Sequence, residues 1–482
     1  MPASRIGPTL PIRSLAALVA LLFLLCAPAV AQAAPEAFAI SIDEYALLID
    51  RDGEELTRRD DYRTIYPLYD ERGVRGDFFV VRSAAHRSEL EADYVYALMD
   101  STGRLLTDFE YRRIERAGDG FFRCLKDDLW GVIDGENRVV LPFEYTSLIS
   151  NGEGGYLALR TPPYNESPNG IYYINAAGEE TATGVKIRYD LYQMDGGLMS
   201  VYAPDDNAEY PCGYINARGE WAIKPQFQWC GPFVGSFAEA SGATGAGVID
   251  KDGNWVITPK YNYVNIGYNG SSGETKQPMI AYGNGLLIVF DRETLAPILQ
   301  RMGGGCYGYA GANGLMAITV NDITTVFDYA GEALFTLPWP SGGVNLWNDF
   351  EYVIVNDADY NAYLFDRAGN QIAGPYQMLS PLDNPAGRGL CFTGMYKTRR
   401  IYYEGSEDWD PGVRNYYESM VPGTYRMGLV DQTGRQIIKP IYDSLYELTS
   451  DRLMAETPQA YYLMDYQGNV IREYPRYFSL DD

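Results

Sequence analysis

Histidine is nearly absent from this sequence, which has one, His86, among 482 residues. Histidine-based metal sites and the Ser-His-Asp and Cys-His catalytic arrangements need an imidazole, so the sequence leaves little room for them. Basic residues are also few: 39 Lys and Arg stand against 64 Asp and Glu, for a formal charge of −25. A phosphate backbone repels so acidic a surface, and we expect no nucleic-acid partner.

Long apolar runs are missing after the first 30 residues. The run of 11 apolar residues from Leu15 to Leu25 follows Arg5 and Arg13 and precedes Ala31-Gln32-Ala33. This order predicts a signal peptide over residues 1–33, a secreted or cell-envelope location, and no membrane span after cleavage. The alternative is an uncleaved anchor, for which the run is short, since a bilayer span takes about 20 residues.

Cysteines are few and lack the spacing of a metal or redox site, because no C-x-x-C occurs. We therefore expect no metal and no cofactor. Five cysteines follow the predicted signal, an odd number that leaves at least one free thiol or an intermolecular bond. Cys212 and Cys230 fall in one repeat and could form a disulfide. The alternative is that both are buried thiols.

What the sequence does contain is a repeat. Two apolar residues, then Asp or Asn, two variable residues and Gly recur along the chain, and the anchors are Asp50, Asp100, Asp134, Asn175, Asn216, Asp250, Asp291, Asp328, Asp366, Asp431 and Asp465. In two units another residue, Asn137 or Thr294, replaces the Gly. Asp or Asn can bond the backbone two residues on, and Gly accepts a positive φ, so each unit predicts a tight β-hairpin turn.

Proline and an aromatic residue follow each of the better hairpins. Pro142, Pro225, Pro259, Pro375 and Pro440 are followed within three residues by Tyr145, Phe227, Tyr261, Tyr376 and Tyr442. We expect the proline to end strand pairing. We expect the aromatic to fill the gap between neighbouring units.

Further β-rich runs between the hairpins predict three or four short strands in each unit of about 40 residues. The fold class is therefore all-β, built from stacked tandem hairpin or meander repeats. Eleven units exceed the four to eight blades typical of a β-propeller, so an open twisted array is the first expectation. The alternative is one or two closed propeller-like rings.

The repeat resembles the WG (KWG) repeat family, in which Trp-Gly precedes the apolar pair and the Asp. The residues that carry the resemblance are Trp130, Gly131, Asp134, Gly213, Asn216, Gly219, Gly247, Asp250, Gly253, Gly428, Asp431 and Gly434. The resemblance implies tandem β units over residues 34–397 and 427–482 and a binding or surface role. It carries no catalytic residues.

An insertion separates two of the anchors, since Asp366 and Asp431 are 65 positions apart. Its excess falls in residues 398–426, and its aromatic and acidic side chains form a candidate ligand surface: Tyr402, Tyr403, Asp408, Trp409, Asp410, Tyr416 and Tyr417. Such insertions often elaborate binding in repeat proteins. The alternative is a tolerated surface loop.

The combined features predict a non-enzymatic exported protein that serves as a binding or scaffold surface in the bacterial envelope, with a protein partner. One alternative is a glycan- or cell-wall-binding module that uses tyrosine and tryptophan platforms, because 41 residues are Tyr. A second alternative is a carboxylate-dependent hydrolase.

Overall fold

The computed structural model describes residues 37–42, 45–58, 61–69, 75–84, 94–160, 169–192, 194–204, 211–267, 276–311, 313–339, 343–346, 352–357, 359, 361–382, 390–403, 415–421, 423–449 and 451–476. For 169, 398–403 and 415–420 it describes the backbone alone. The predicted signal peptide and His86 lie outside these ranges.

All regular structure in these ranges is β, as the sequence predicts. The first sheet has five strands, β1 (Phe38–Ile42), β2 (Tyr45–Ile49), β3 (Tyr62–Tyr69), β4 (Arg75–Ser83) and β5 (Ala97–Asp100). The second contains β6 (Arg113–Arg116), β7 (Phe121–Lys126), β8 (Leu129–Asp134) and β9 (Val139–Tyr145). The third contains β10 (Ser147–Ser150), β11 (Tyr156–Leu159), β12 (Asn169–Ile174) and β13 (Glu180–Ile187).

The middle of the chain forms four sheets. The fourth has three strands, β14 (Leu198–Tyr202), β15 (Cys212–Asn216) and β16 (Trp221–Phe227). The fifth contains β17 (Trp229–Val234), β18 (Phe237–Gly242), β19 (Gly245–Ile249) and β20 (Trp255–Tyr261). The sixth contains β21 (Tyr263–Asn265), β22 (Met279–Gly283), β23 (Leu286–Phe290) and β24 (Pro297–Met302), and the seventh β25 (Tyr307–Ala310), β26 (Leu315–Val320), β27 (Ile323–Asp328) and β28 (Ala333–Thr336).

Three further sheets follow. The eighth contains β29 (Gly343–Asn345), β30 (Tyr352–Asn356), β31 (Ala362–Asp366) and β32 (Gln371–Tyr376). The ninth contains β33 (Met378–Pro381), β34 (Leu390–Met395), β37 (Arg426–Asp431) and β38 (Gln436–Tyr442), and the separate pair β35 (Thr398–Tyr403) and β36 (Asn415–Met420) interrupts it. The tenth contains β39 (Ser444–Thr449), β40 (Arg452–Glu456), β41 (Ala460–Met464) and β42 (Val470–Pro475).

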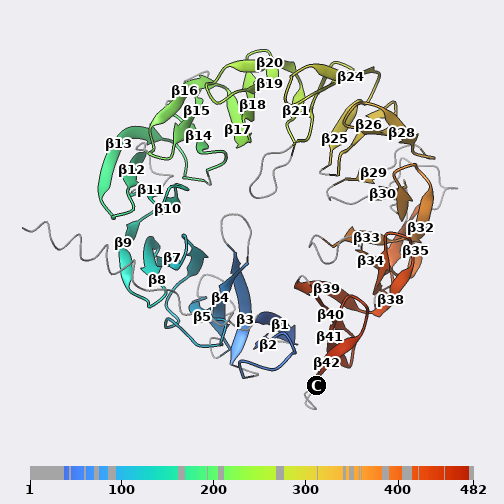
Figure 1. Ribbon diagram of the computed structural model, residues 1–482, viewed down its shortest axis with the longest axis horizontal. Coiled ribbons are helices and arrows are strands. Elements are labelled where there is room, and N and C mark those ends of the chain that lie inside the picture. Colours follow the sequence, from blue (N-terminus) through green and yellow to red (C-terminus); the bar gives the residue numbers. More distant parts are fainter. Residues whose placement is uncertain are drawn as a thin grey trace, which may run out of the picture.

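The ten sheets are the blades of a β-propeller (Figure 1). Neighbouring strands are antiparallel, and in blades such as β17–β20 the first strand lies nearest the centre of the ring and the last lies outside (Figure 1). The ring is the arrangement that the sequence offered as its alternative, in place of the open array. Eleven anchors occupy ten blades because the five-stranded first sheet carries both Asp50 and Asp100.

Apolar side chains fill the interfaces between adjoining blades. One cluster joins Phe227 of β16 to Cys230 and Phe233 of β17, and another joins Tyr261 of β20 to Val264 of β21. Tyr145, Phe227 and Tyr261 are all buried there. The aromatic that follows each proline therefore fills the gap between units, as expected. Burial of shared faces is the main stabilising contribution in such an array.

The repeated turn has the local geometry that its sequence predicts. The carboxylate of Asp250 accepts hydrogen bonds from the backbone N–H groups of Asp252 (3.0 Å) and Asn254 (2.9 Å), and Gly253 has a φ of 82°. Asn137 substitutes for Gly with a φ of 61°. In the unit with Thr294, the positive φ moves one residue on, to Leu295 (60°), because this turn is one residue longer.

The glycine before the apolar pair permits a bulge in the neighbouring strand. Ala246 pairs with Tyr261 and Val248 with Ile257, so Gly247 alone faces three residues around Pro259. A Cβ on Gly247 would lie 2.4 Å from the carbonyl oxygen of Ile257. The expectation that this proline ends strand pairing was wrong: the bulge absorbs the missing N–H, and pairing resumes at the aromatic.

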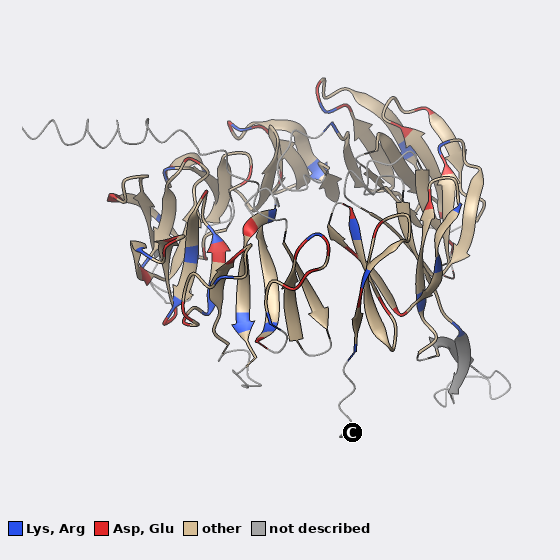
Figure 2. Ribbon diagram, turned by 60° about the horizontal axis from the view of Figure 1, so that its bottom comes forward, with Lys and Arg blue, Asp and Glu red and all other residues tan. Residues whose placement is uncertain are grey.

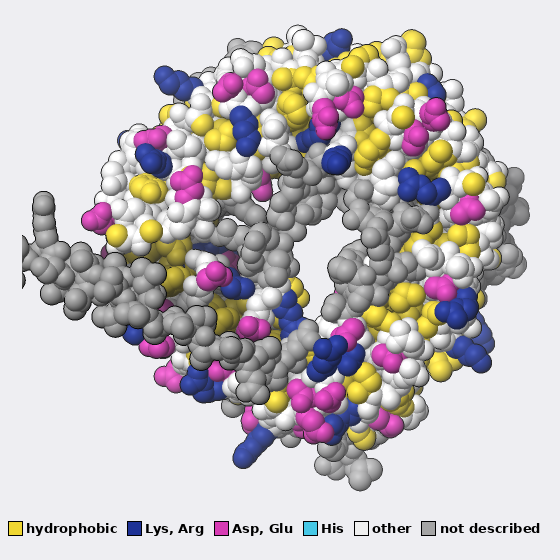
Figure 3. Space-filling model, viewed as in Figure 1, with side chains coloured by type: hydrophobic (Ala, Val, Ile, Leu, Met, Phe, Trp, Pro, Cys, Tyr) yellow, Lys and Arg dark blue, Asp and Glu magenta, His cyan; other side chains and the backbone are white. Residues whose placement is uncertain are grey.

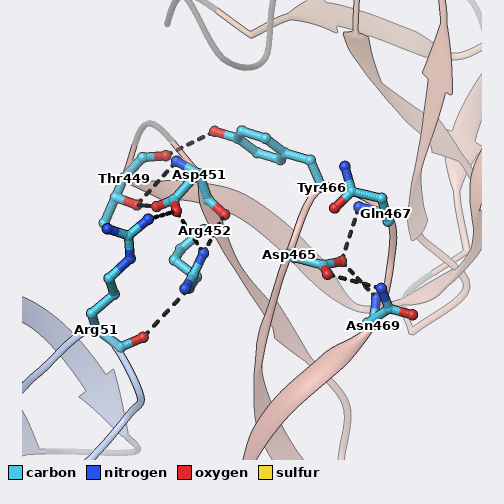
Figure 4. Close-up of polar contacts among 8 residues, drawn as sticks. All are labelled: Arg51, Thr449, Asp451, Arg452, Asp465, Tyr466, Gln467 and Asn469. Carbon is cyan, nitrogen blue, oxygen red and sulfur yellow. Dashed lines mark hydrogen bonds and ion pairs between the residues drawn. The ribbon is translucent and has the colours of Figure 1, made fainter.

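The two ends of the chain close the ring. Phe38, Ile40 and Leu47 pack with Leu463 and Tyr474 in one buried cluster between the first and last blades. Around this cluster, Arg51 of the first blade pairs with Asp451, and Arg452 donates to the carbonyl of Arg51 (Figure 4). The closure is thus made by packing between faces, because β1 and β42 belong to different sheets.

Charged residues are spread around the ring (Figure 2). Many of the arginines are paired with carboxylates, as Arg138 is with Asp134 (2.6 Å) and Arg435 with Asp431 (3.0 Å). Both pairs join a turn anchor to the residue four positions on. Exposed pairs of this kind add little to stability.

Candidate functional site

A cavity of about 720 Å³ lies among β17, β18, β21 and β25 of the fifth, sixth and seventh blades. These blades surround part of the opening at the centre of the ring, which Figure 3 shows as a hollow. The wall of the cavity includes Trp229, Glu239, Tyr263, Asn265 and Tyr309. A concave site with aromatic faces and a few polar groups is the usual form of a ligand pocket.

Two of the inner strands that line the cavity begin with a partly exposed aromatic residue. Trp229 begins β17 and Tyr263 begins β21, and each residue is 43 % exposed. The residues that follow them, Cys230 and Val264, are buried between blades. Because side chains alternate along a strand, burial of the one fixes the opposite orientation of the other.

Two carboxyl groups line the same cavity, and burial raises the pKa of both. The pKa of Glu239 is raised to about 7 by burial, which the backbone N–H of Val264 only partly offsets. Burial also raises the pKa of Asp195, which lines the same cavity. A carboxyl group with a pKa near 7 can donate or accept a hydrogen bond at neutral pH.

Arg292 bridges two blades beside the cavity. It is 8 % exposed, and its guanidinium donates to the carbonyl oxygens of Val234 and Ile266, both at 2.5 Å. Val234 ends β17 and Ile266 follows β21, so the bridge joins the ends of the two inner strands that line the cavity. Burial lowers the pKa of Arg292, and the carbonyl oxygens supply its hydrogen bonds.

The structure describes part of the candidate surface that the sequence predicts. β35 and β36 form a two-stranded pair in which Tyr402 is opposite Tyr416 and Ile401 is opposite Tyr417, and Tyr403 ends β35. Asp408, Trp409 and Asp410 lie outside the described residues. The described lining of the cavity comes from other strands. Binding by the insertion therefore remains a prediction.

The sequence reasoning missed Trp229, Glu239 and Tyr263. One signal was available: Trp229 and Tyr307 each stand 21 residues before their anchors, Asp250 and Asp328. Tyr263 is further from its anchor, Asp291, because residues 268–275 lengthen that unit.

Cys212 and Cys230 form a disulfide, with their Cα atoms 6.1 Å apart. It ties β15 to β17 and so links two neighbouring blades, beside the cavity residue Gly231. Among the described cysteines, Cys124, Cys306 and Cys391 are free thiols. The described ranges contain no group of three His, Cys, Asp or Glu side chains placed to hold a metal ion. They also contain no helical segment that could span a bilayer.

The family of the repeats follows from four segments. Residues 130–159, 213–241, 247–270 and 427–456 match the family described as "WG containing repeat". Four segments of this chain match the WG repeat. The four matches include the units built on Gly131, Gly213, Gly247 and Gly428. In each of these units, the glycine lies opposite the bulge that contains the proline. The second and third WG repeats contain Trp229, Glu239 and Tyr263, so the cavity is formed largely by WG-repeat residues.

No curated protein matches the sequence. Among solved structures, the chain is similar to one titled "Crystal structure of the eukaryotic initiation factor", at 12 % identity over 63 % of this chain and 85 % of that one, with a TM-score of 0.37. It is also similar to BamB from Moraxella catarrhalis, at 12 % identity over 59 % and 93 % of the two chains, with a TM-score of 0.28. A third is apo AztD from Citrobacter koseri, at 11 % identity over 70 % and 93 %, with a TM-score of 0.28.

Proposed function

We propose that this WG-repeat propeller is an exported, non-enzymatic binding protein of the bacterial envelope and that its ligand is a cell-wall glycan held in the cavity of the fifth to seventh blades. The cavity carries the proposal, because its wall combines the partly exposed aromatic residues Trp229 and Tyr263 with the carboxyl groups of Glu239 and Asp195. Repeat propellers expose their inner strands and loops for binding, which agrees with a scaffold role.

The chemistry of the wall suits a sugar. A pyranose ring has an apolar face that packs on an aromatic ring, and its edge carries hydroxyl groups that need hydrogen bonds. The side chains of Glu239, Asp195 and Asn265 supply both donors and acceptors at the cavity. A positively charged ligand would need different chemistry in this wall, because both carboxyl groups would have to be ionised to attract it.

Binding without turnover is the proposal, and the two carboxyl groups at the cavity make hydrolysis the alternative to test. Glycoside hydrolysis needs one carboxyl group with a raised pKa and another that stays ionised. We expect no release of reducing ends when the protein is incubated with cell-wall glycan. Release that is lost in Glu239→Gln would replace this proposal with the hydrolase alternative.

The test is retention of the purified protein on protein-free cell-wall sacculi. We expect the wild type to be retained and Trp229→Ala to be retained roughly threefold to tenfold less, because an aromatic contact is worth about 0.5–1.5 kcal/mol beyond its buried area. Tyr69→Ala is the matched control, since Tyr69 is 54 % exposed and lies outside the cavity. Equal retention of all three proteins, or none, would contradict the proposal.

A protein partner is the second candidate, and the outer strands support it. Val139 and Val140 of β9 and Ile441 of β38 are 60 %, 46 % and 59 % exposed on the outermost strands of their blades. Exposed aliphatic side chains on a strand edge suit docking by another chain. Capture of one envelope protein that is lost in Val139→Lys, with no retention on sacculi, would favour this function.

A further inference from the structure

Four successive blades carry an aromatic residue at the same position of their innermost segment. Trp229, Tyr263 and Tyr307 are each the first residue of the first strand in the fifth, sixth and seventh blades. They are paired with Ser241, Tyr282 and Thr319. These three partners in turn pair with Ala246, Leu287 and Thr324, each four residues before its turn anchor. The three aromatics therefore occupy one register position.

Tyr189 occupies the same position in the fourth blade, although no regular strand is formed there. The backbone N–H of the preceding residue, Arg188, donates to the carbonyl of Tyr202 at 3.0 Å. The same bond joins Gln228 to Ser241 (2.9 Å) and Asn262 to Tyr282 (3.0 Å). Tyr202 pairs with Cys212, which is four residues before the anchor Asn216.

All four aromatics are partly exposed. Tyr189, Trp229, Tyr263 and Tyr307 are 38 %, 43 %, 43 % and 45 % exposed. Each partner residue lies close to the hairpin that joins the second and third strands, so the four aromatics lie towards one face of the ring. The series stops at both ends, because the equivalent positions are Ser147 of β10 and Gly343 of β29.

We propose that these four side chains form a track that holds one linear glycan strand along the inner wall, with one aromatic contact per blade. Packed sheets lie about 10 Å apart, so neighbouring members of the track have roughly that spacing. Each sugar of an extended β-1,4-linked strand lengthens the glycan by roughly half of this spacing. Every second sugar therefore meets an aromatic, and the repeating unit that fits one blade is a disaccharide.

This inference rests on the proposed function, because the cavity at Trp229 and Tyr263 is the middle of the track. It adds a specific ligand class: a linear β-1,4-linked strand of about four disaccharides, and neither a branched sugar nor a single disaccharide. Several weak contacts on one strand combine because each new contact is intramolecular once the first has formed.

The test uses peptide-free glycan strands from sacculi, separated into fractions of one to four disaccharides, and measures their dissociation constants for the purified protein. We expect each added disaccharide to tighten binding by roughly threefold to tenfold, the range that an aromatic contact supplies. Binding should stop improving beyond four disaccharides, since the track ends there.

Variants at the two ends of the track provide the decisive comparison. In Tyr307→Ala and Tyr189→Ala, we expect the four-disaccharide strand to bind no better than the three-disaccharide strand does to the wild type. Binding of one disaccharide should be unchanged, and Tyr307→Phe and Tyr69→Ala should behave as the wild type. Trp229→Ala should weaken binding of every strand.

The outcomes separate the two proposals. If one disaccharide binds as tightly as four, or if Tyr307→Ala and Tyr189→Ala leave all affinities unchanged, the track is wrong while the cavity remains a glycan site. If strands of every length fail to bind, the proposed function is wrong and the track falls with it.

Discussion

The side-chain hydroxyl of Tyr474 donates a hydrogen bond of 2.7 Å to the backbone carbonyl of Gly53, a residue 421 positions earlier in the chain. Nearby, the guanidinium of Arg472 pairs with Glu54 at 2.5 Å. The tyrosine ring itself is buried among Phe38, Ile40 and Leu47. One side chain of the last strand thus contributes both apolar burial and a polar contact to the closure of the ring.

Truncation of Tyr474 should open this seam before it unfolds the other blades. We expect Tyr474→Ala to lower the free energy of unfolding by about 3–5 kcal/mol, as for other large buried aromatics, and Tyr474→Phe by about 1 kcal/mol, from one lost hydrogen bond. Hydrogen exchange would be measured across β1, β2 and β39–β42. Protection lost uniformly around the ring, rather than first in these strands, would contradict a distinct seam.

The glycine that faces each proline bulge should tolerate no side chain. We expect Gly247→Ala to destabilise the protein by more than 2 kcal/mol, on the order of a severe steric substitution, because its Cβ would lie 2.4 Å from a backbone oxygen. Gly135→Ala, in another repeat, is the matched control, since nothing lies within 4 Å of its Cβ position and its φ is not positive. Chemical denaturation of the two variants measures the difference. A similar cost for both would show that close approach is not why the motif has glycine.

The disulfide should stabilise the junction of the fourth and fifth blades. Its two cysteines are 18 residues apart, and a closed loop of about that length is worth about 3 kcal/mol. We expect a reductant to lower the melting temperature of the wild type and to leave that of the Cys212→Ala/Cys230→Ala double variant unchanged. Cys306→Ser should respond to the reductant as the wild type does. An unresponsive wild type would mean that the two thiols are not bonded.

Glu239 should make stability fall as the pH rises. Its folded-state pKa is about 7, and its ordinary value is 4.5. Between these values the folded protein holds a proton that the unfolded chain has released, so the free energy of unfolding decreases with pH and levels off above about 7. We expect Glu239→Gln to lack this decrease and to be more stable than the wild type at pH 8. Glu136→Gln, an exposed turn residue, is the control. A pH profile shared by wild type and Glu239→Gln would contradict the assignment.

The sequence predicts what neighbouring residues decide and loses accuracy where distant segments meet. Asp250 and Gly253 lie in one turn, and their side-chain and backbone preferences alone specify its geometry. Closure depends on how far each blade rotates relative to the last, and on whether Tyr474 then reaches Gly53. No local pattern encodes that sum of small angles, so the open array and the ring could not be separated from the sequence.

The candidate site could be predicted less well than the fold. The insertion drew attention because its aromatic residues are close together in the sequence, whereas Trp229 and Tyr263 are separated by a complete four-stranded blade. Only the register places them side by side around the wall. Glu239 also lies in an ordinary alternating strand, and its environment depends on the neighbouring blade that buries it.

The seam between the first and last blades resembles every other junction, since it too is a packed interface between two faces of successive sheets. A ring sealed in this way has no privileged starting blade. A gene in which the two ends are joined and new ends are opened between β20 and β21 should still encode the same ring. By the same logic, duplication or loss of a whole unit would change the circumference of the ring without requiring a new kind of contact, so its size can evolve one repeat at a time.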